Sequence, residues 1–96
     1  MKELTIPPAA YKDAASAEVL RVWIANQQQH VTLLYDAWED PGVWGIFLAD
    51  LARHVVNAFE QKELGDPEEL LVRIRALFNA ELDSPTDTAK GSIVAN

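Results

Sequence analysis

The sequence predicts an α+β fold in which a β-hairpin is followed by two amphipathic α-helices. Two runs rich in β-branched and aromatic residues, 18–25 and 30–38, predict the strands. Two Asp-Pro pairs, at 40–41 and 66–67, each precede an apolar stripe with helical spacing and so predict the helix starts. These signals place one domain at 18–83, an N-terminal arm at 1–17 and a flexible C-terminal tail at 84–96.

The run at 18–25 suits either a strand or a helix. As a strand it places Leu20, Val22 and Ile24 on one face and Trp23 on the other, whereas the spacing of Leu20, Trp23 and Ile24 also fits a helical period. The alternation at 30–38 favours the strand, because two such runs make a hairpin. The connecting loop is then 26–29, where Asn26 can adopt the left-handed conformation.

The two predicted helices have clear apolar stripes. The first begins at Pro41 and ends near Leu64, ahead of Gly65. Its stripe comprises Trp44, Phe47, Leu48, Leu51, Val55, Ala58 and Phe59. The second helix follows Asp66-Pro67, and its stripe comprises Leu70, Leu71, Ile74, Leu77, Phe78 and Leu82. We expect the helices to form an αα turn and the first stripe to pack on the hairpin.

The two ends of the chain lack a sustained period. Pro7 and Pro8 favour an extended arm, which Leu4, Ile6 and Tyr11 could pin to the surface. Residues 84–92 are small and polar and cannot offset the entropy lost on ordering, so a mobile tail is expected, although Ile93 and Val94 could dock it.

Composition excludes several functional classes. With 49% apolar and 24% charged residues the 96-residue chain is an ordinary globular domain, and having no cysteine it has no disulfide, thiolate metal site or cysteine nucleophile. A net charge of −7 without a basic cluster argues against nucleic acid and anionic membrane surfaces as partners. The N-terminus lacks the apolar run of a signal peptide, and the expected location is the cytoplasm.

Six residues are candidate ligand or partner contacts. Asp50 and His54 are four apart on the first helix and could pair, with Arg53 beside them as an anion contact, but a solvated helix flank is the more common reading. A metal shared by His30 and His54 would need further oxygen ligands from Asp36 or Asp50. The other candidates are Trp23, Trp38 and Trp44, which more often anchor cores or interfaces than line pockets. We assign no catalytic, cofactor-binding or metal-binding residue.

Apolar residues on both faces of the hairpin predict self-association. Val31, Leu33 and Tyr35 share one face of the second run, and Leu34 and Trp38 share the other. A two-stranded sheet is marginal alone and has two free edges, so we expect a homodimer that completes the sheet through strand edges or packs face to face. The alternative is that the N-terminal arm covers the second face within one chain.

A set of short motifs resembles a small bacterial family known only as a domain of unknown function. The resemblance spans residues 20–82 and rests on Leu20-Arg21-Val22-Trp23, His30-Val31-Thr32-Leu33, Trp38-Glu39-Asp40-Pro41, Trp44-Gly45, Leu48-Ala49-Asp50, Arg53-His54 and Arg73-Ile74-Arg75. It implies a short bacterial protein and names no activity. Gln27 and Gln28 replace glycines at the hairpin loop of the family pattern.

The sequence therefore favours a non-enzymatic protein-interaction or adaptor module, with a second copy of itself and an unidentified protein as partners. It contains no glycine-rich phosphate loop, GxSxG elbow or HExxH motif, and no cofactor is expected. The alternative function is a small-molecule or metal binder that uses the helix face with Asp50, Arg53 and His54.

Overall fold

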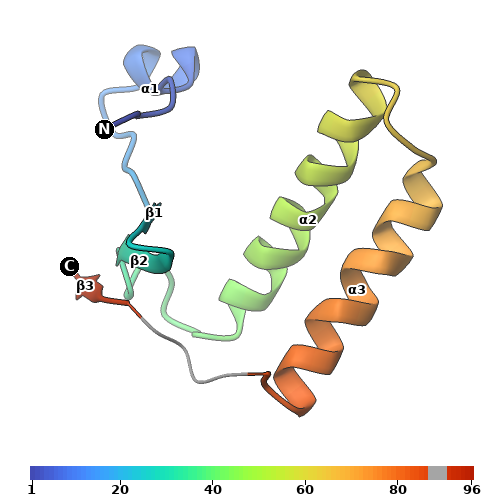
Figure 1. Ribbon diagram of the computed structural model, residues 1–96. Helices are drawn as coiled ribbons and strands as arrows, with labels where there is room; N and C mark the ends of the chain where they lie inside the picture. The colour runs from blue at the N-terminus through green and yellow to red at the C-terminus, as the bar shows by residue number, and fades with distance from the viewer. Residues whose placement is uncertain (87–90) are drawn as a thin grey trace. The chain divides into compact units, whose positions relative to one another are not determined.

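The computed structural model describes residues 1–86 and 91–96 and has the predicted α+β fold (Figure 1). In chain order its elements are α1 (Pro8–Lys12), β1 (Leu20–Ala25), β2 (Gln28–Leu33), α2 (Val43–Gln61), α3 (Pro67–Asp83) and β3 (Ile93–Ala95). The run at 18–25 is therefore a strand and not a helix.

The chain divides into two compact units, whereas the sequence predicts a single domain at 18–83. The first unit contains Met1–Ala37 and the C-terminal strand, and the second begins at Trp38 and contains α2 and α3. In the first unit the strands form a hydrogen-bonded sheet, and in the second unit the two helices pack as an antiparallel pair (Figure 1).

The hairpin turn is shorter than predicted. Asn26 (φ 53°) and Gln27 (φ 60°) both adopt the left-handed conformation, so two residues connect the strands in the manner of a type I′ turn. The predicted loop at 26–29 and strand at 30–38 are therefore wrong in their bounds: the strand begins at Gln28 and ends at Leu33, and Trp38 lies beyond it. Asn26 confirms the predicted left-handed position.

The strand register confirms the predicted faces of β1, but the second apolar face predicted for the hairpin is wrong, because Leu34, Tyr35 and Trp38 lie beyond the end of β2 at Leu33. Leu20 pairs with Leu33 and Val22 pairs with Val31, so these four side chains lie on one face of the sheet, with Ile24 farther along β1. Trp23 pairs with His30 and therefore lies on the opposite face. The two faces differ in chemistry, because the first is almost entirely apolar and the second carries Trp23 beside polar groups.

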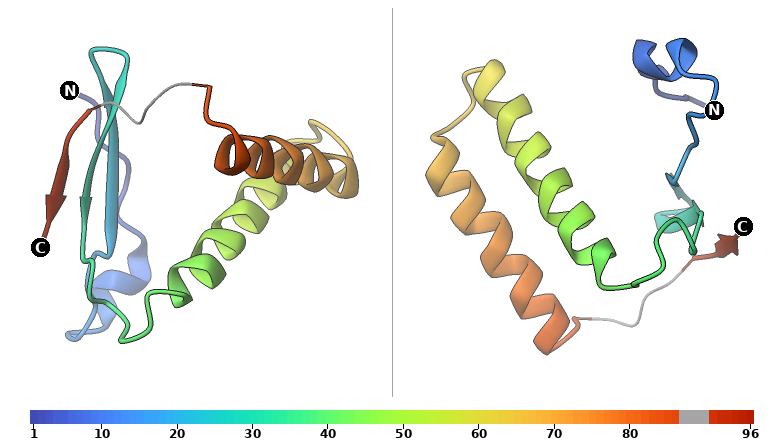
Figure 2. Two further views of the ribbon diagram at one scale, coloured as in Figure 1. Left: turned by 90° about the horizontal axis from the view of Figure 1, so that it is seen from below. Right: turned by 180° about the vertical axis from the view of Figure 1, so that it is seen from behind.

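The end of the chain adds a third strand that the sequence did not predict. β3 pairs in parallel with β2, which places it beside β2 in the order β1-β2-β3 (Figure 2). Val31 N–H donates to Ser92 O at 2.9 Å, and Asn96 N–H donates to Leu33 O at 2.9 Å. The expectation of a flexible tail over 84–96 is thus wrong for 93–95, because free backbone groups of β2 provide partners; residues 87–90 lie outside the described residues.

The N-terminal arm also differs from the extended form expected at 1–17. Residues 8–12 form the short helix α1, because Pro8 occupies its first turn, where a missing N–H breaks no hydrogen bond. The arm is tied to β1 by an ion pair, since Arg21 Nη1 lies 3.2 Å from Glu3 Oε2. Leu4, Ile6 and Tyr11, the residues expected to pin it, are exposed.

The helix starts follow from local capping chemistry. Asp66 caps α3 as predicted, its carboxylate accepting the Glu69 N–H at 3.1 Å. Asp40 accepts the Gly42 N–H at 2.8 Å and so shapes the turn that leads into α2, which begins two residues later than predicted.

Helix α2 ends at Gln61, earlier than the predicted Leu64, because Glu63 takes the left-handed conformation (φ 55°). Glu63 N–H then donates to Glu60 O and Leu64 N–H donates to Phe59 O, both at 2.9 Å, which is the Schellman pattern. That position is usually a glycine, so an L-residue there is strained.

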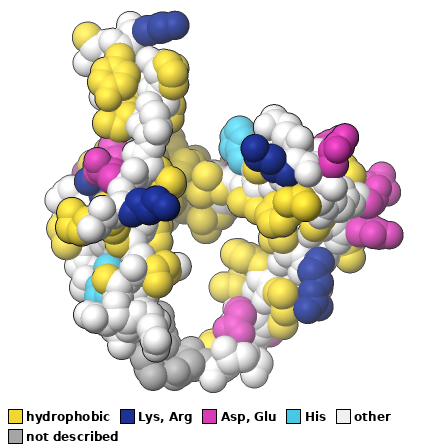
Figure 3. All heavy atoms as spheres, turned by 45° about the horizontal axis from the view of Figure 1, so that its top comes forward, with side chains coloured by type: hydrophobic (Ala, Val, Ile, Leu, Met, Phe, Trp, Pro, Cys, Tyr) yellow, Lys and Arg dark blue, Asp and Glu magenta, His cyan; other side chains and the backbone are white. Residues whose placement is uncertain are grey.

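Very little of the chain is buried. Within the described residues the buried hydrophobic core consists of Val56 alone, which is 6% exposed. Large apolar side chains lie open on both units (Figure 3). A chain of this length ordinarily hides roughly two-thirds of its surface and several side chains completely.

We predict that Gly91→Ala releases β3 from the sheet. Gly91 has φ 111°, and a Cβ there would overlap the backbone carbonyl of Gln29. Hydrogen exchange of the β3 amides should become at least about tenfold faster, as the loss of a hydrogen bond of ~1.5 kcal/mol implies. Gly45→Ala is the matched control, because a Cβ at residue 45 meets no atom within 4 Å. Unchanged protection in Gly91→Ala would contradict this placement of the strand.

We predict that Glu63→Gly stabilises the protein. Glycine removes the strain of a left-handed L-residue, so the free energy of unfolding should rise by up to about 1 kcal/mol in denaturant titrations at fixed protein concentration. Glu60→Gly, within the last turn of α2, should instead lower it by about 1 kcal/mol. Equal losses in both variants would show that residue 63 is not strained.

Candidate functional site

An aromatic cluster lies where the chain enters α2: Trp38 precedes the helix, and Trp44 and Phe47 lie near its start. The Trp38 and Trp44 rings meet edge to face with centroids 5.2 Å apart, and Phe47 lies 5.5 Å from Trp38 and 5.2 Å from Trp44. All three side chains are half-buried. The arrangement is typical of aromatic packing, and it fixes the chain as it enters α2. Two of the three predicted tryptophan contacts are therefore brought together.

Trp23 lies in β1, beside the N-terminal arm. It is half-buried and lines an open hollow of about 730 Å³ together with arm residues that include Leu4 and Ile6. Val22 and Ile24 of the other face line the same hollow, so the arm lies along β1 and does not cover the second face of the hairpin as the alternative expected. Ile24 is 71% exposed.

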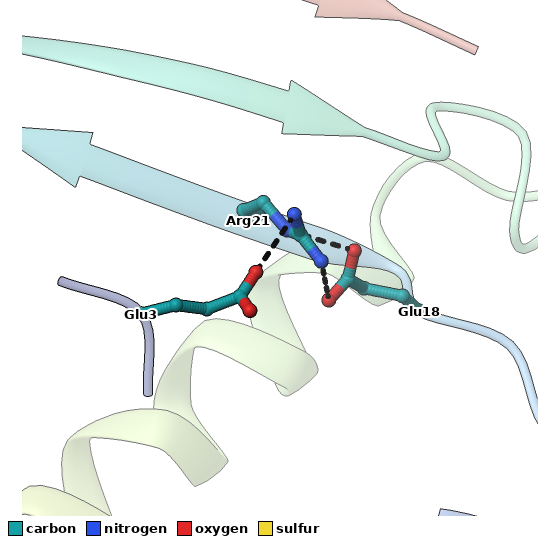
Figure 4. A network of polar contacts seen from close by, with 3 residues as sticks. All are labelled: Glu3, Glu18 and Arg21. Atoms are coloured by element: carbon teal, nitrogen blue, oxygen red, sulfur yellow. Dashed lines mark hydrogen bonds and ion pairs between the residues drawn. The ribbon is translucent and has the colours of Figure 1, made fainter. Parts of the chain in front are cut away.

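Arg21 joins the arm to the strand. Its guanidinium donates to Glu18 at 3.1 Å and also pairs with Glu3 (Figure 4). The hydrogen bond to Glu18, followed by the negative charges of Glu18 and Glu3, raises the pKa of Arg21. This network is exposed. Its role is to position the arm, because the charged Arg21 holds Glu3 of the arm beside β1.

The predicted helix face of Asp50, Arg53 and His54 lies in α2 and is exposed. In the described part of the chain, none of the three forms a hydrogen bond or an ion pair with another side chain. The spacing of four puts Asp50 and His54 on one side of the helix, but the carboxylate–imidazole pair that this spacing allows is not formed, and the residues lie on an exposed flank, the more common arrangement. The three residues do not form a catalytic constellation.

Only Arg53 of these three lines a groove. The groove runs between α2 and α3, has a volume of about 330 Å³ and is mostly apolar. Its lining comprises Gly45, Leu48, Ala49, Ala52, Arg53, Leu71, Ile74, Arg75, Phe78 and Asn79. Within residues 1–86 and 91–96, no carboxylate forms an ion pair with Arg53 or Arg75. Two free guanidinium groups beside apolar side chains suit a ligand with an anionic head and an apolar body.

His30 is already occupied by hydrogen bonds. Its Nδ1 accepts the Ser92 N–H at 3.1 Å and lies 2.8 Å from Ser92 Oγ, which leaves Nε2 to donate to Ala25 O at 3.1 Å. The ring thus bridges the hairpin and the start of β3, and metal binding at His30 would break these bonds. Among the described residues, no group of three or more His, Cys, Asp or Glu side chains could hold a metal ion.

Two functional features lie outside the sequence prediction. Arg75 lies in the motif Arg73-Ile74-Arg75, but only the packing of α3 on α2 shows which arginine reaches the groove. Ser92 and Gly91 lie in a segment that resembles a tail, and their roles depend on pairing with β2, about 60 residues away in sequence. No helix in the described ranges combines the length and apolar character required to cross a membrane.

The chain belongs to the family described as "Domain of unknown function (DUF5076)", whose model matches residues 3–86. This confirms the resemblance to a domain-of-unknown-function family. A solved structure titled "Structure of a putative pyruvate dehydrogenase from the photosynthetic bacterium Rhodopseudomonas palustrus CGA009" is 33% identical, with a TM-score of 0.73. The match covers 95% of this chain and 93% of that one. A search of curated proteins gave no match.

Proposed function

We propose that this chain is a non-enzymatic protein-interaction module that works as a homodimer and presents an acidic surface to another protein. The observation that carries the proposal is the small buried core: Val56 is the one buried apolar residue among those described. Folding costs about 1–2 kcal/mol of backbone entropy per residue, and apolar side chains that stay exposed contribute little to offsetting it. A partner that covers apolar surface supplies the missing stabilisation.

The sheet supports this proposal through its open face and edge. Val22 and Ile24 of β1 and Ile93 of β3 are exposed, and they lie on the same face by register. β3 covers one edge of β2, and β1 forms a free edge of the sheet. Exposed apolar faces and free edges mark interaction surfaces in stable proteins.

The charge of the chain indicates the chemistry of the further partner. With 15 acidic and 8 basic residues, the chain repels phosphate backbones and attracts basic protein surfaces. The described residues present no constellation of nucleophile, base and orienting group, which supports a role in binding over catalysis.

We predict that the protein is a dimer in solution. Light scattering at micromolar concentration should give twice the mass of one chain, and the unfolding midpoint should rise with protein concentration, because dimer formation is coupled to folding. A folded monomer whose midpoint does not depend on concentration would refute the proposal.

A second candidate, a small-molecule binder, is supported by the groove between α2 and α3. The candidate predicts that a medium-chain carboxylate such as decanoate binds there through its head to Arg53 or Arg75. By calorimetry, Arg53→Gln or Arg75→Gln should weaken binding about tenfold, the cost of one charge-assisted hydrogen bond. Arg73→Gln removes the same charge from α3 outside the groove and should leave the Kd unchanged. Equal effects from all three substitutions would remove the support for this candidate.

A further inference from the structure

We infer that α2 packs against α2 of a second copy, so that two helix pairs form a four-helix bundle. The inference rests on the proposed homodimer and names its interface. The surface concerned is an apolar seam on α2, defined by Trp44, Leu48, Leu51, Val55 and Ala58.

The spacing of the α2 seam indicates a helix as its occupant. The intervals between its residues are four, three, four and three, which is the heptad alternation of two helices that pack along their length. Apolar positions three and four apart occur on any amphipathic helix, and their regular heptad alternation here is the form that suits a second helix. Helix–helix packing of this type is the usual geometry of four-helix bundles.

Most of the seam is exposed and turned away from the contact with α3, and one of its five residues, Leu48, also lines the groove between the two helices. Leu48, Leu51 and Val55 are all open, and Val55 is 46% exposed. Val56, the buried residue, follows Val55 by one position and therefore lies about 100° round the helix. α2 thus has one side against α3 and a separate apolar side, as a helix at the corner of a bundle has two neighbours.

A second copy fits the charge pattern of the seam. In this heptad the flanking positions are Gly45, Phe47, Ala52, His54, Phe59 and Gln61, and none carries a carboxylate. The charged residues Asp50, Arg53 and Glu60 occupy positions farthest from the seam. Two chains of charge −7 can therefore pack at this surface without close contacts between like charges, because its flanking positions carry no carboxylate.

The exposed area is sufficient for a specific contact. The seam together with Phe59 and the exposed Leu77 of α3 presents on the order of 500 Å² per copy, or about 1,000 Å² for a symmetric pair, where specific interfaces begin. The seam is centred on Leu51, so a two-fold axis near Leu51 would let an antiparallel α2–α2 pair bury the same patch of both copies.

Three arginine substitutions test this interface by light scattering. Val55→Arg lies on the seam and should halve the mass at micromolar concentration. Ile46→Arg is the matched control, because Ile46 is 64% exposed on the same helix but nine residues away, on the opposite side. Ile24→Arg places the same charge on the open sheet face. The expected result is that Val55→Arg alone gives monomer.

The other outcomes separate the two proposals. A monomeric wild-type protein refutes the proposed function itself. If the wild type is a dimer that Val55→Arg does not dissociate, or that Ile24→Arg alone dissociates, the helix interface is wrong and the homodimer stands.

A second measurement does not perturb the packing. Because the chain has no cysteine, single spin labels can be placed at Ala58→Cys on the seam and at Asn57→Cys away from it. In the dimer the distance between the two labels should be shorter for residue 58 by about 5 Å, because both positions are separated by roughly 20 Å along the helices and differ in their lateral separation. Equal distances, or a shorter distance for residue 57, would overturn the helix interface even if Val55→Arg fails to fold.

Discussion

The structure depends on one physical constraint, the shortage of buried apolar surface within a single chain. Among the described residues only Val56 is buried, while the sheet and the helix pair each expose large apolar side chains. Hydrogen bonds contribute only about 1 kcal/mol each in net terms, so the sheet ladder and two helices do not replace a core. Any molecule that covers the exposed apolar surface would therefore stabilise the fold, which is the link between folding and association that the proposed dimer uses.

Local chemistry defines each element even without a large core. Asn26 and Gln27 fix the hairpin by adopting left-handed conformations, and Asp66 fixes the start of α3 through one hydrogen bond. His30 connects both strands of the hairpin to the segment before β3. Such devices determine register and helix bounds, whereas the stabilising free energy arises from burial. The bounds of each element are thus specified locally, whereas stability depends on how much apolar surface is covered.

The parts of the fold that could be predicted from sequence are those with local causes. Asp66 and the apolar stripes predicted α3 and most of α2, and alternation predicted which face holds Leu20 and Val22. β3 could not be predicted as a strand, because it has only three apolar residues after a polar segment and pairs with a strand far away in sequence. The sequence predicted only part of the groove lining. Spacing identified Arg53 as a contact, whereas the packing of α3 on α2 adds Arg75 to the lining and leaves Asp50 and His54 outside it.

The two surfaces of the helix pair meet at Leu48 and otherwise occupy different sides of α2. Arg53 lines the groove, and it lies two positions from both Leu51 and Val55 of the α2 seam. Two positions correspond to about 200° round a helix, so burying the seam leaves the Arg53 side of the groove open. A dimer built on the seam would therefore display two copies of the groove with their arginines free. Association and recognition of an anionic group then share Leu48 but not the arginines, and a dimeric scaffold gains avidity for any partner that offers two such groups.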